Sequence, residues 1–166
     1  MQRVGKISNA LTGSAALCKC LRAIGVARRI PPKHYLFKVD DTSDGVFLVR
    51  RGKVALLVDE LPHLDRVFLA GSVVGLPSTF TGNAYSLTAV TLADSEIVHV
   101  PRDEFLELMS RDSTLCREAT EILSRELSFI QAALAQRGEP KRQFKRPNWK
   151  SKGAGKGVLA QRFAKR

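Results

Sequence analysis

The chain has 166 residues, of which 44% are hydrophobic, and a formal net charge of +11. This length allows one domain with a substantial core and excludes two ordinary domains. The charge is concentrated at one end, because residues 137–166 hold eleven Lys or Arg and one acid, whereas residues 1–136 hold sixteen basic and fifteen acidic residues. We therefore predict a domain of ordinary charge over residues 1–136, followed by a basic and largely disordered tail.

Three further features limit the class of protein. No apolar run approaches the roughly 18 residues of a membrane span. The N-terminal region is too polar for a signal peptide, so we expect a cytoplasmic location. The three cysteines, Cys18, Cys20 and Cys116, form an odd set, which argues against a disulfide framework. Their number and spacing suit neither a metal knuckle nor an iron–sulfur cluster, and we expect no metal and no cofactor.

The predicted elements begin with a helix over residues 8–25. Ser8 or Asn9 would cap it, and Gly25 would end it. From residue 35 the apolar residues recur with a period of two, in short runs separated by turn-rich clusters. These runs predict strands at residues 35–39, 46–49, 54–58, 66–70, 72–74, 85–93 and 95–100. The fold class that follows is mainly β with flanking helices, an antiparallel double-stranded β-helix (jelly roll) over residues 33–100.

Two helices should follow the barrel. Pro101 suits the first turn of a short helix, and Ser113 can cap a long one that runs to about residue 136. The long helix has a narrow apolar stripe, widened on one side by Ile122, Phe129 and Ala133. The stripe consists of Cys116, Ala119, Leu123, Leu127, Ile130 and Leu134. About 24 residues, roughly 36 Å, exceed what a small barrel can cover, so we favour a homodimer seam over packing on the barrel alone.

Three segments in this order resemble the cyclic-nucleotide-binding domain of the catabolite-activator (Crp/Fnr-like) superfamily. Residues 45–56 match its strand–turn–strand around G-x-V, and residues 71–75 match the G-x-x-x-G entry to its phosphate cassette. Residues 86–105 match its last strands and the start of its short helix. The resemblance covers residues 10–136, and it implies a jelly roll that binds an effector and performs no catalysis.

The resemblance also implies a ligand site. Its residues would be Gly75, Leu76, Pro77, Ser78, Thr79, Tyr85 and Ser86 in the cassette, with Gln131 on the long helix. Members that bind cyclic nucleotides carry a glutamate after the glycine and an arginine about ten residues later. Leu76 and Tyr85 stand at these two positions. Because a buried phosphate without its cation is costly, we expect an effector other than a cyclic nucleotide bound in the usual pose; a vestigial pocket filled by Leu76, Phe80 and Tyr85 is the alternative.

Transcription regulators of this superfamily continue with a winged helix-turn-helix, and residues 137–166 lack its periodicity. The tail has two interpretations, a solvated extension or a nonspecific contact with nucleic acid phosphates. The residues of such a contact would be Lys141, Arg142, Lys145, Arg146, Trp149 and Lys150, with the Trp149 ring able to stack on an unpaired base.

No catalytic constellation is visible, since His34, His63 and His99 are isolated in the sequence. The prediction is therefore a non-catalytic regulatory sensor that binds a small effector. Its alternative is a protein associated with nucleic acid through the tail, in which the barrel serves as a dimer platform.

Overall fold

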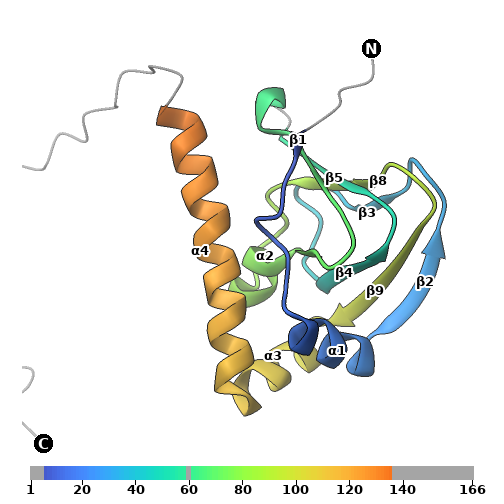
Figure 1. Cartoon of the computed structure of the whole chain (residues 1–166), viewed down its shortest axis with the longest axis vertical. Coiled ribbons are helices and arrows are strands. Elements are labelled where there is room, and N and C mark those ends of the chain that lie inside the picture. Colours follow the sequence, from blue (N-terminus) through green and yellow to red (C-terminus); the bar gives the residue numbers. More distant parts are fainter. Residues whose placement is uncertain (1–5, 59–60, 136–166) are drawn as a thin grey trace, which may run out of the picture.

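The computed structural model describes residues 6–58 and 61–135, and its strands form two facing sheets (Figure 1). The five-stranded sheet has the order β1-β6-β5-β8-β3, and the four-stranded sheet has the order β2-β9-β4-β7. In chain order the strands are β1 Lys6–Ile7, β2 Val26–Ile30, β3 Tyr35–Phe37, β4 Gly45–Arg51, β5 Val54–Leu57, β6 Arg66–Phe68, β7 Val73–Val74, β8 Thr88–Thr91 and β9 Ser95–Pro101. Every pairing is antiparallel except the parallel one between β1 and β6. The predicted class, mainly β with flanking helices, is confirmed.

Two strands escaped prediction, and β2 is the longer of them. It pairs with β9 along its whole length, from Val26 opposite His99 to Ile30 opposite Ser95. Four of its five side chains are exposed, so the alternation of apolar and polar residues that marks a half-buried strand is missing. Residues 26–30, ahead of the predicted start of the jelly roll at residue 33, therefore belong to its sheets.

The first helix, α1, spans Ala15–Ile24, so the predicted start at Ser8 or Asn9 was wrong. The Ser14 hydroxyl caps it by accepting from the Leu17 amide at 3.1 Å. The residues before Ser14 extend the sheets instead, because the Ser8 amide donates to the Val67 carbonyl and Thr12 forms a bridge with Ser72. Backbone hydrogen bonds with the barrel thus override the helical spacing of the N-terminal sequence.

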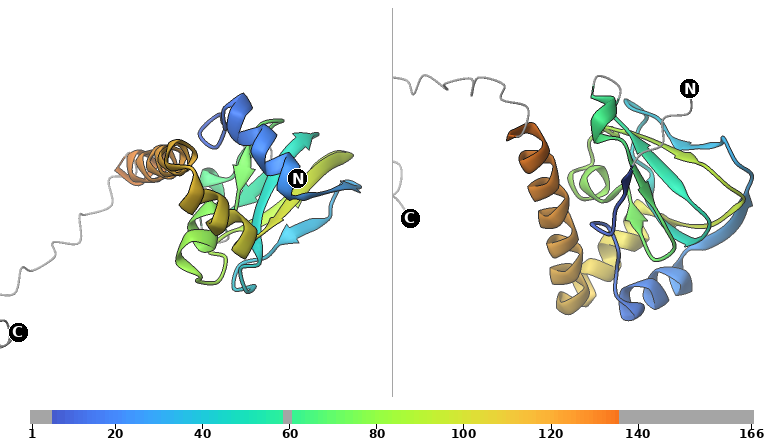
Figure 2. Two further views of the ribbon diagram at one scale, coloured as in Figure 1. Left: turned by 90° about the horizontal axis from the view of Figure 1, so that it is seen from below. Right: turned by 45° about the horizontal axis from the view of Figure 1, so that its top comes forward.

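The remaining helices are the 3-10 turn η1 Pro62–Leu64, α2 Leu76–Thr81, α3 Arg102–Arg111 and α4 Ser113–Ala135. Asp112, not Ser113, caps α4, since its Oδ1 accepts from the amides of Thr114 and Leu115 at 3.0 Å each. Figure 2 shows α4 standing beside the barrel, with α1 and α3 near its N-terminal end. In the described part of the chain, no helix is both long enough and apolar enough to cross a membrane.

The long helix presents two different apolar faces. Leu115, Ala119 and Ile122 are buried against the rest of the domain, so Ala119, which the sequence placed in the stripe favoured as a dimer seam, packs inside the domain instead. Leu127 is 56% exposed. Cys116, Thr120, Leu123, Leu127 and Ile130 recur at alternating steps of four and three, which is the spacing of a coiled-coil seam. We call these five residues the outer seam; the side chains of Ala133 and Leu134 lie outside the described residues.

Candidate functional site

The cassette begins at Gly75, between β7 and α2, where the backbone has a φ of 89°. A side chain at this position would be strained in that left-handed conformation. Its Cβ would also lie 3.1 Å from the Gly45 carbonyl oxygen and 3.3 Å from Cε1 of Tyr85. The glycine therefore allows α2, Leu76–Thr81, to turn closely over the barrel.

The cassette hydroxyls are engaged within the fold. Thr79 donates to the Gly75 carbonyl at 2.8 Å, and Ser78 donates to the Ala84 carbonyl at 3.1 Å. Both side chains are buried, whereas Ser86 is exposed. At the other end of α2, Nε of Arg102 donates to the Thr79 carbonyl at 2.9 Å. These bonds stabilise the shape of the cassette and leave Ser86 as its accessible hydroxyl.

Tyr85 lies in the core at the position where the resemblance expects an arginine. Its ring stacks on Phe37 with centroids 3.9 Å apart, and its side chain is 3% exposed. The hydroxyl oxygen lies 2.7 Å from the Gly45 carbonyl oxygen and 2.9 Å from Oδ1 of Asp44. Burial, and next the hydrogen bond to Asp44, raise the pKa of Tyr85 to about 12. The aromatic ring thus fills the space that an anion-binding arginine would need.

Replacing Tyr85 with phenylalanine should lower the free energy of unfolding by about 1–2 kcal/mol at pH 7, because a buried hydrogen bond is lost. This difference should shrink above pH 10. Unfolded tyrosine ionises near pH 10, whereas folded Tyr85 ionises near pH 12. The free energy of unfolding of the wild type therefore falls as the pH rises between these values. Y85F has no hydroxyl to ionise at this position, so its free energy of unfolding does not fall for this reason.

Denaturant unfolding at pH 7 and pH 10.5 measures both effects of Y85F. Tyr35→Phe is the matched control, because the Tyr35 side chain is 56% exposed and should tolerate the change at either pH. If the free energies of unfolding of Y85F and the wild type differ by the same amount at the two pH values, the conclusion that the Tyr85 hydroxyl is buried is contradicted.

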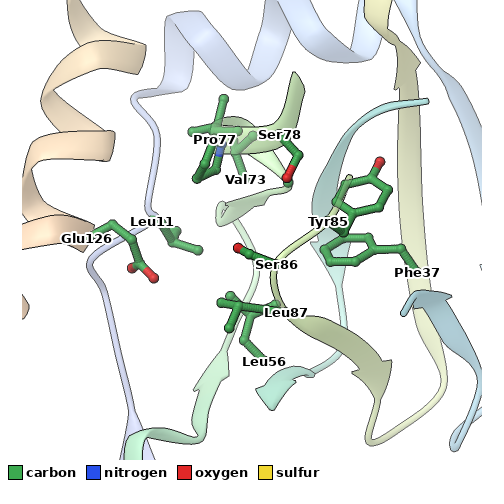
Figure 3. Close-up of a pocket in the computed structure, with 12 residues that line it drawn as sticks. Leu11, Phe37, Leu56, Val73, Pro77, Ser78, Tyr85, Ser86, Leu87 and Glu126 are labelled. Carbon is green, nitrogen blue, oxygen red and sulfur yellow. The ribbon is translucent and has the colours of Figure 1, made fainter. Parts of the chain in front are cut away.

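A cavity of about 40 Å³ lies between the cassette and α4 (Figure 3). Tyr85 and Phe37 stand at one side of it, and the Glu126 carboxylate of α4 stands at the other. The remaining wall is mostly apolar and consists of Leu11, Leu56, Val73, Gly75, Leu76, Pro77, Ser78, Ser86 and Leu87. Ligand pockets in proteins usually hold roughly 300–1,000 Å³, so this cavity admits a group of only a few atoms.

The structure brings most of the predicted ligand-site residues together. Six line the cavity, namely Gly75, Leu76, Pro77, Ser78, Tyr85 and Ser86. Thr79 is buried behind them, and Gln131 is exposed on α4 and does not line the cavity. The predicted nucleic-acid residues, from Lys141 to Lys150, lie outside the described residues.

Sequence reasoning missed Glu126 as a cavity residue. The available signal was its position: Leu115, Ala119, Ile122 and Glu126 recur at helical spacing on one face of α4. An acid on an otherwise buried face requires a buried partner. A metal does not supply it, since no group of three His, Cys, Asp or Glu side chains within residues 6–58 and 61–135 could hold a metal ion.

Residues 27–112, just over half of the chain, match the sequence profile of the cyclic nucleotide-binding domain. The chain belongs to this family. Members of the family are regulatory binding proteins and not enzymes. The barrel, the cassette at α2 and the adjacent α4 are therefore the parts of a regulatory binding domain, in the order that the sequence predicted.

Solved structures share this fold. The catabolite activator protein of Thermus thermophilus is 22% identical, with a TM-score of 0.65 over 78% of this chain and 62% of that one. A transcriptional regulator of Thermotoga maritima is 18% identical, with a TM-score of 0.62 over 73% and 97%. A protein solved in a study of cyclic-GMP-dependent signalling in bacterial phytopathogenesis is 20% identical, with a TM-score of 0.61 over 73% and 96%.

The chain spans only part of some of these relatives. It covers 62% of the Thermus thermophilus protein and 58% and 60% of two further matched structures. No curated protein sequence matches it. At these identities the likeness establishes the fold, and the ligand has to be inferred from the residues of this chain.

Proposed function

We propose that this chain is a non-catalytic, cytoplasmic sensor that dimerises through α4 and responds to a small effector in the cassette cavity. The effector is not a cyclic nucleotide held in the usual pose. The observation that carries this proposal is the position of the cavity, which is walled by the cassette on one side and by Glu126 of α4 on the other. A chemical group that enters the cavity must contact both the cassette and α4.

Two features of the cavity argue against a cyclic nucleotide. Leu76 is 1% exposed and Tyr85 is 3% exposed, and both are packed in the core where the ribose and phosphate anchors would stand. In addition, the cavity volume of about 40 Å³ is far below that of a nucleotide pocket. A small effector could enter with modest rearrangement and displace α4, which would shift the dimer between two states.

The outer seam supports the proposed homodimer. Its residues recur at coiled-coil spacing beside the buried face of α4, with Cys116 and Leu123 partly buried against the core and Leu127, the fourth of the five, 56% exposed. A partly exposed stripe of this period is typical of a helix that pairs with a second copy. The dimer would place two copies of α4 side by side, so that a movement of either helix reaches the partner.

Leu127→Lys should convert the dimer into a monomer, because it places a charge at the exposed apolar position of the outer seam. Ser128→Lys is the matched control, since Ser128 is exposed on a different face of the helix. Light scattering on the full chain at several concentrations measures the mass. A monomeric wild type, or a dimer that survives L127K, would refute pairing through the outer seam.

The sensing role is tested with spin labels at position 124 on α4 in the full-length dimer. The distance between the two labels is measured alone and with candidate small molecules that raise the melting temperature. We expect a stabilising molecule to change the distance, and Tyr85→Ala to abolish both effects. If stabilising molecules leave the α4 distance unchanged, the domain does not signal through α4.

The second candidate function is contact with nucleic acid through residues 137–166, favoured by eleven basic residues against one acid. In a full-length variant, Lys141, Arg142, Lys145, Arg146 and Lys150 are replaced by serine. If the tail binds phosphates, the wild type should bind single-stranded DNA with a steep salt dependence, and the variant should lose most of this affinity. Equal binding by both chains would reject the tail as the contact.

A further inference from the structure

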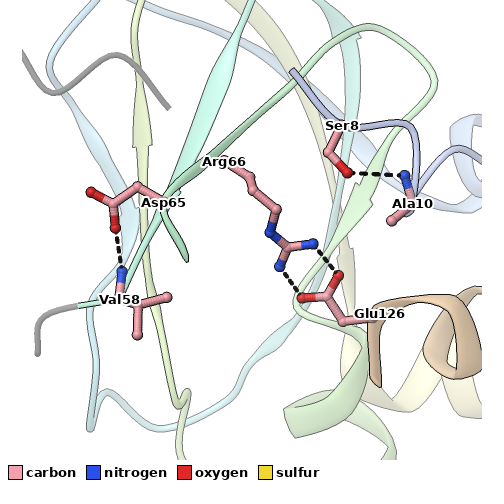
Figure 4. Close-up of polar contacts among 6 residues, drawn as sticks. All are labelled: Ser8, Ala10, Val58, Asp65, Arg66 and Glu126. Atoms are coloured by element: carbon pink, nitrogen blue, oxygen red, sulfur yellow. Dashed lines mark hydrogen bonds and ion pairs between the residues drawn. The ribbon is translucent and has the colours of Figure 1, made fainter. Parts of the chain in front are cut away.

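Arg66 and Glu126 form an ion pair between the barrel and α4 (Figure 4). Nη1 of Arg66 lies 2.7 Å from Oε2 of Glu126, and Nη2 donates to Oε1. The residues are only 2% and 7% exposed. This two-point geometry is the one by which a planar guanidinium recognises a carboxylate most selectively.

The barrel and α4 both hold the guanidinium in place, since Arg66 belongs to a barrel strand and its guanidinium lies 4.2 Å from the centre of the Phe129 ring of α4. Arg66 belongs to β6, where it pairs with Lys6 of β1 on one side and Leu56 of β5 on the other. Its guanidinium lies 5.2 Å from the Phe68 ring of the same strand. Among the described residues, its Nε has no hydrogen-bond partner. The two terminal nitrogens therefore point at the one space that the Glu126 carboxylate fills.

The same carboxylate closes the cassette cavity. Glu126 is the one charged residue among the described residues that line it, and Leu11, Leu56 and Leu87 form the apolar wall nearby (Figure 3). An apolar cavity that ends at a carboxylate held by an arginine has the chemistry needed for a short-chain carboxylic acid. The arginine would bind its carboxylate, and the apolar wall would accept its alkyl group.

Arg66 itself does not line the cavity but lies behind Glu126, which does. We infer that Arg66 would bind the anionic group of a ligand in this cavity and that the Glu126 carboxylate stands in for a ligand carboxylate. A short-chain acid would replace Glu126 on Arg66 and place its carbon chain against Leu56 and Leu87. The cavity of about 40 Å³ restricts this chain to a few carbons. Binding of the acid at Arg66 is independent of the proposed sensing function. The further claim, that α4 then loses its buried ionic contact with β6 and transmits a signal, rests on that proposed function.

The test is a titration of the full chain with acetate, propionate and butyrate, against sodium chloride and inorganic phosphate at equal ionic strength. Calorimetry and thermal unfolding report binding. We expect butyrate to raise the melting temperature of the wild type more than chloride or phosphate does. Glu126→Gln removes the competing charge and should bind butyrate about tenfold more tightly. The double variant R66M/E126L, which has an apolar pair in the same place, should not respond.

The contrast between the wild type and R66M/E126L decides the inference even if E126Q fails to fold. An equal response to butyrate in these two proteins, no response in the wild type, or stronger binding of phosphate than of butyrate would overturn it. Binding in the expected pattern without a change in the α4 distance would keep the carboxylate site and remove the sensing function. If only a different effector changes the α4 distance, the sensing function is kept and the carboxylate site is removed.

Discussion

Replacing Arg66 with methionine should lower the free energy of unfolding by about 3–5 kcal/mol, the largest single effect that we expect on the interface between the barrel and α4. The substitution leaves the Glu126 carboxylate, 7% exposed, without its cation. The cavity beside Glu126 is lined mostly by apolar side chains, so the carboxylate gains little solvation unless α4 moves outward. Urea unfolding at pH 7, followed by far-UV circular dichroism, measures the loss.

Two controls separate charge burial from a general loss of packing. R66M/E126L should recover most of the stability, because an apolar pair of similar volume avoids the cost of burying ions. Arg50→Met makes the same change in the surface pair Arg50–Glu96, whose nitrogen and oxygen are 2.8 Å apart and whose arginine side chain is 50% exposed. That variant should lose less than about 1 kcal/mol. A mild effect of R66M comparable to that of R50M would show that the buried pair contributes little.

The sequence predicted the barrel well because most of its strands are short apolar runs that are buried in the core. β4 and β5 are short, continuous runs of buried apolar residues, β9 alternates in part, and turn-forming residues separate the runs, so the strands are visible in the sequence alone. The prediction from the sequence failed for β2, because its exposed side chains show no alternation of apolar and polar residues. It also failed for residues 8–14, where backbone hydrogen bonds to the sheets override the helical spacing of the sequence.

The candidate site was predictable only in part, for a physical reason. The cassette residues follow each other along the chain, so the resemblance could place Leu76 and Tyr85 without coordinates. The pair formed by Arg66 and Glu126 joins residues 60 positions apart. The sequence shows one charged residue in a strand and one on a helix face, and only the packing of α4 against β6 brings them together.

Restoring the missing family glutamate by Leu76→Glu should destabilise the domain by about 3–5 kcal/mol and should not create tight binding of a cyclic nucleotide. Leu76 is 1% exposed, and the neighbouring wall of the cavity is apolar, so a carboxylate there finds no cation. Burial raises the pKa of such a carboxyl above its value in the unfolded chain. The unfolded state then binds fewer protons than the folded one, and the loss of stability should grow as the pH rises from 5 to 8.

Unfolding of L76E and of the matched control Leu76→Met at pH 5 and pH 8 tests this expectation, and calorimetry with cyclic AMP tests the binding. L76M retains the volume and should cost less than about 1.5 kcal/mol at both pH values. Tight nucleotide binding by L76E would mean that the lost carboxylate alone prevented it. If the variant stays folded and does not bind, the obstacle is the packing of Tyr85 on Phe37, which fills the place of the phosphate anchor.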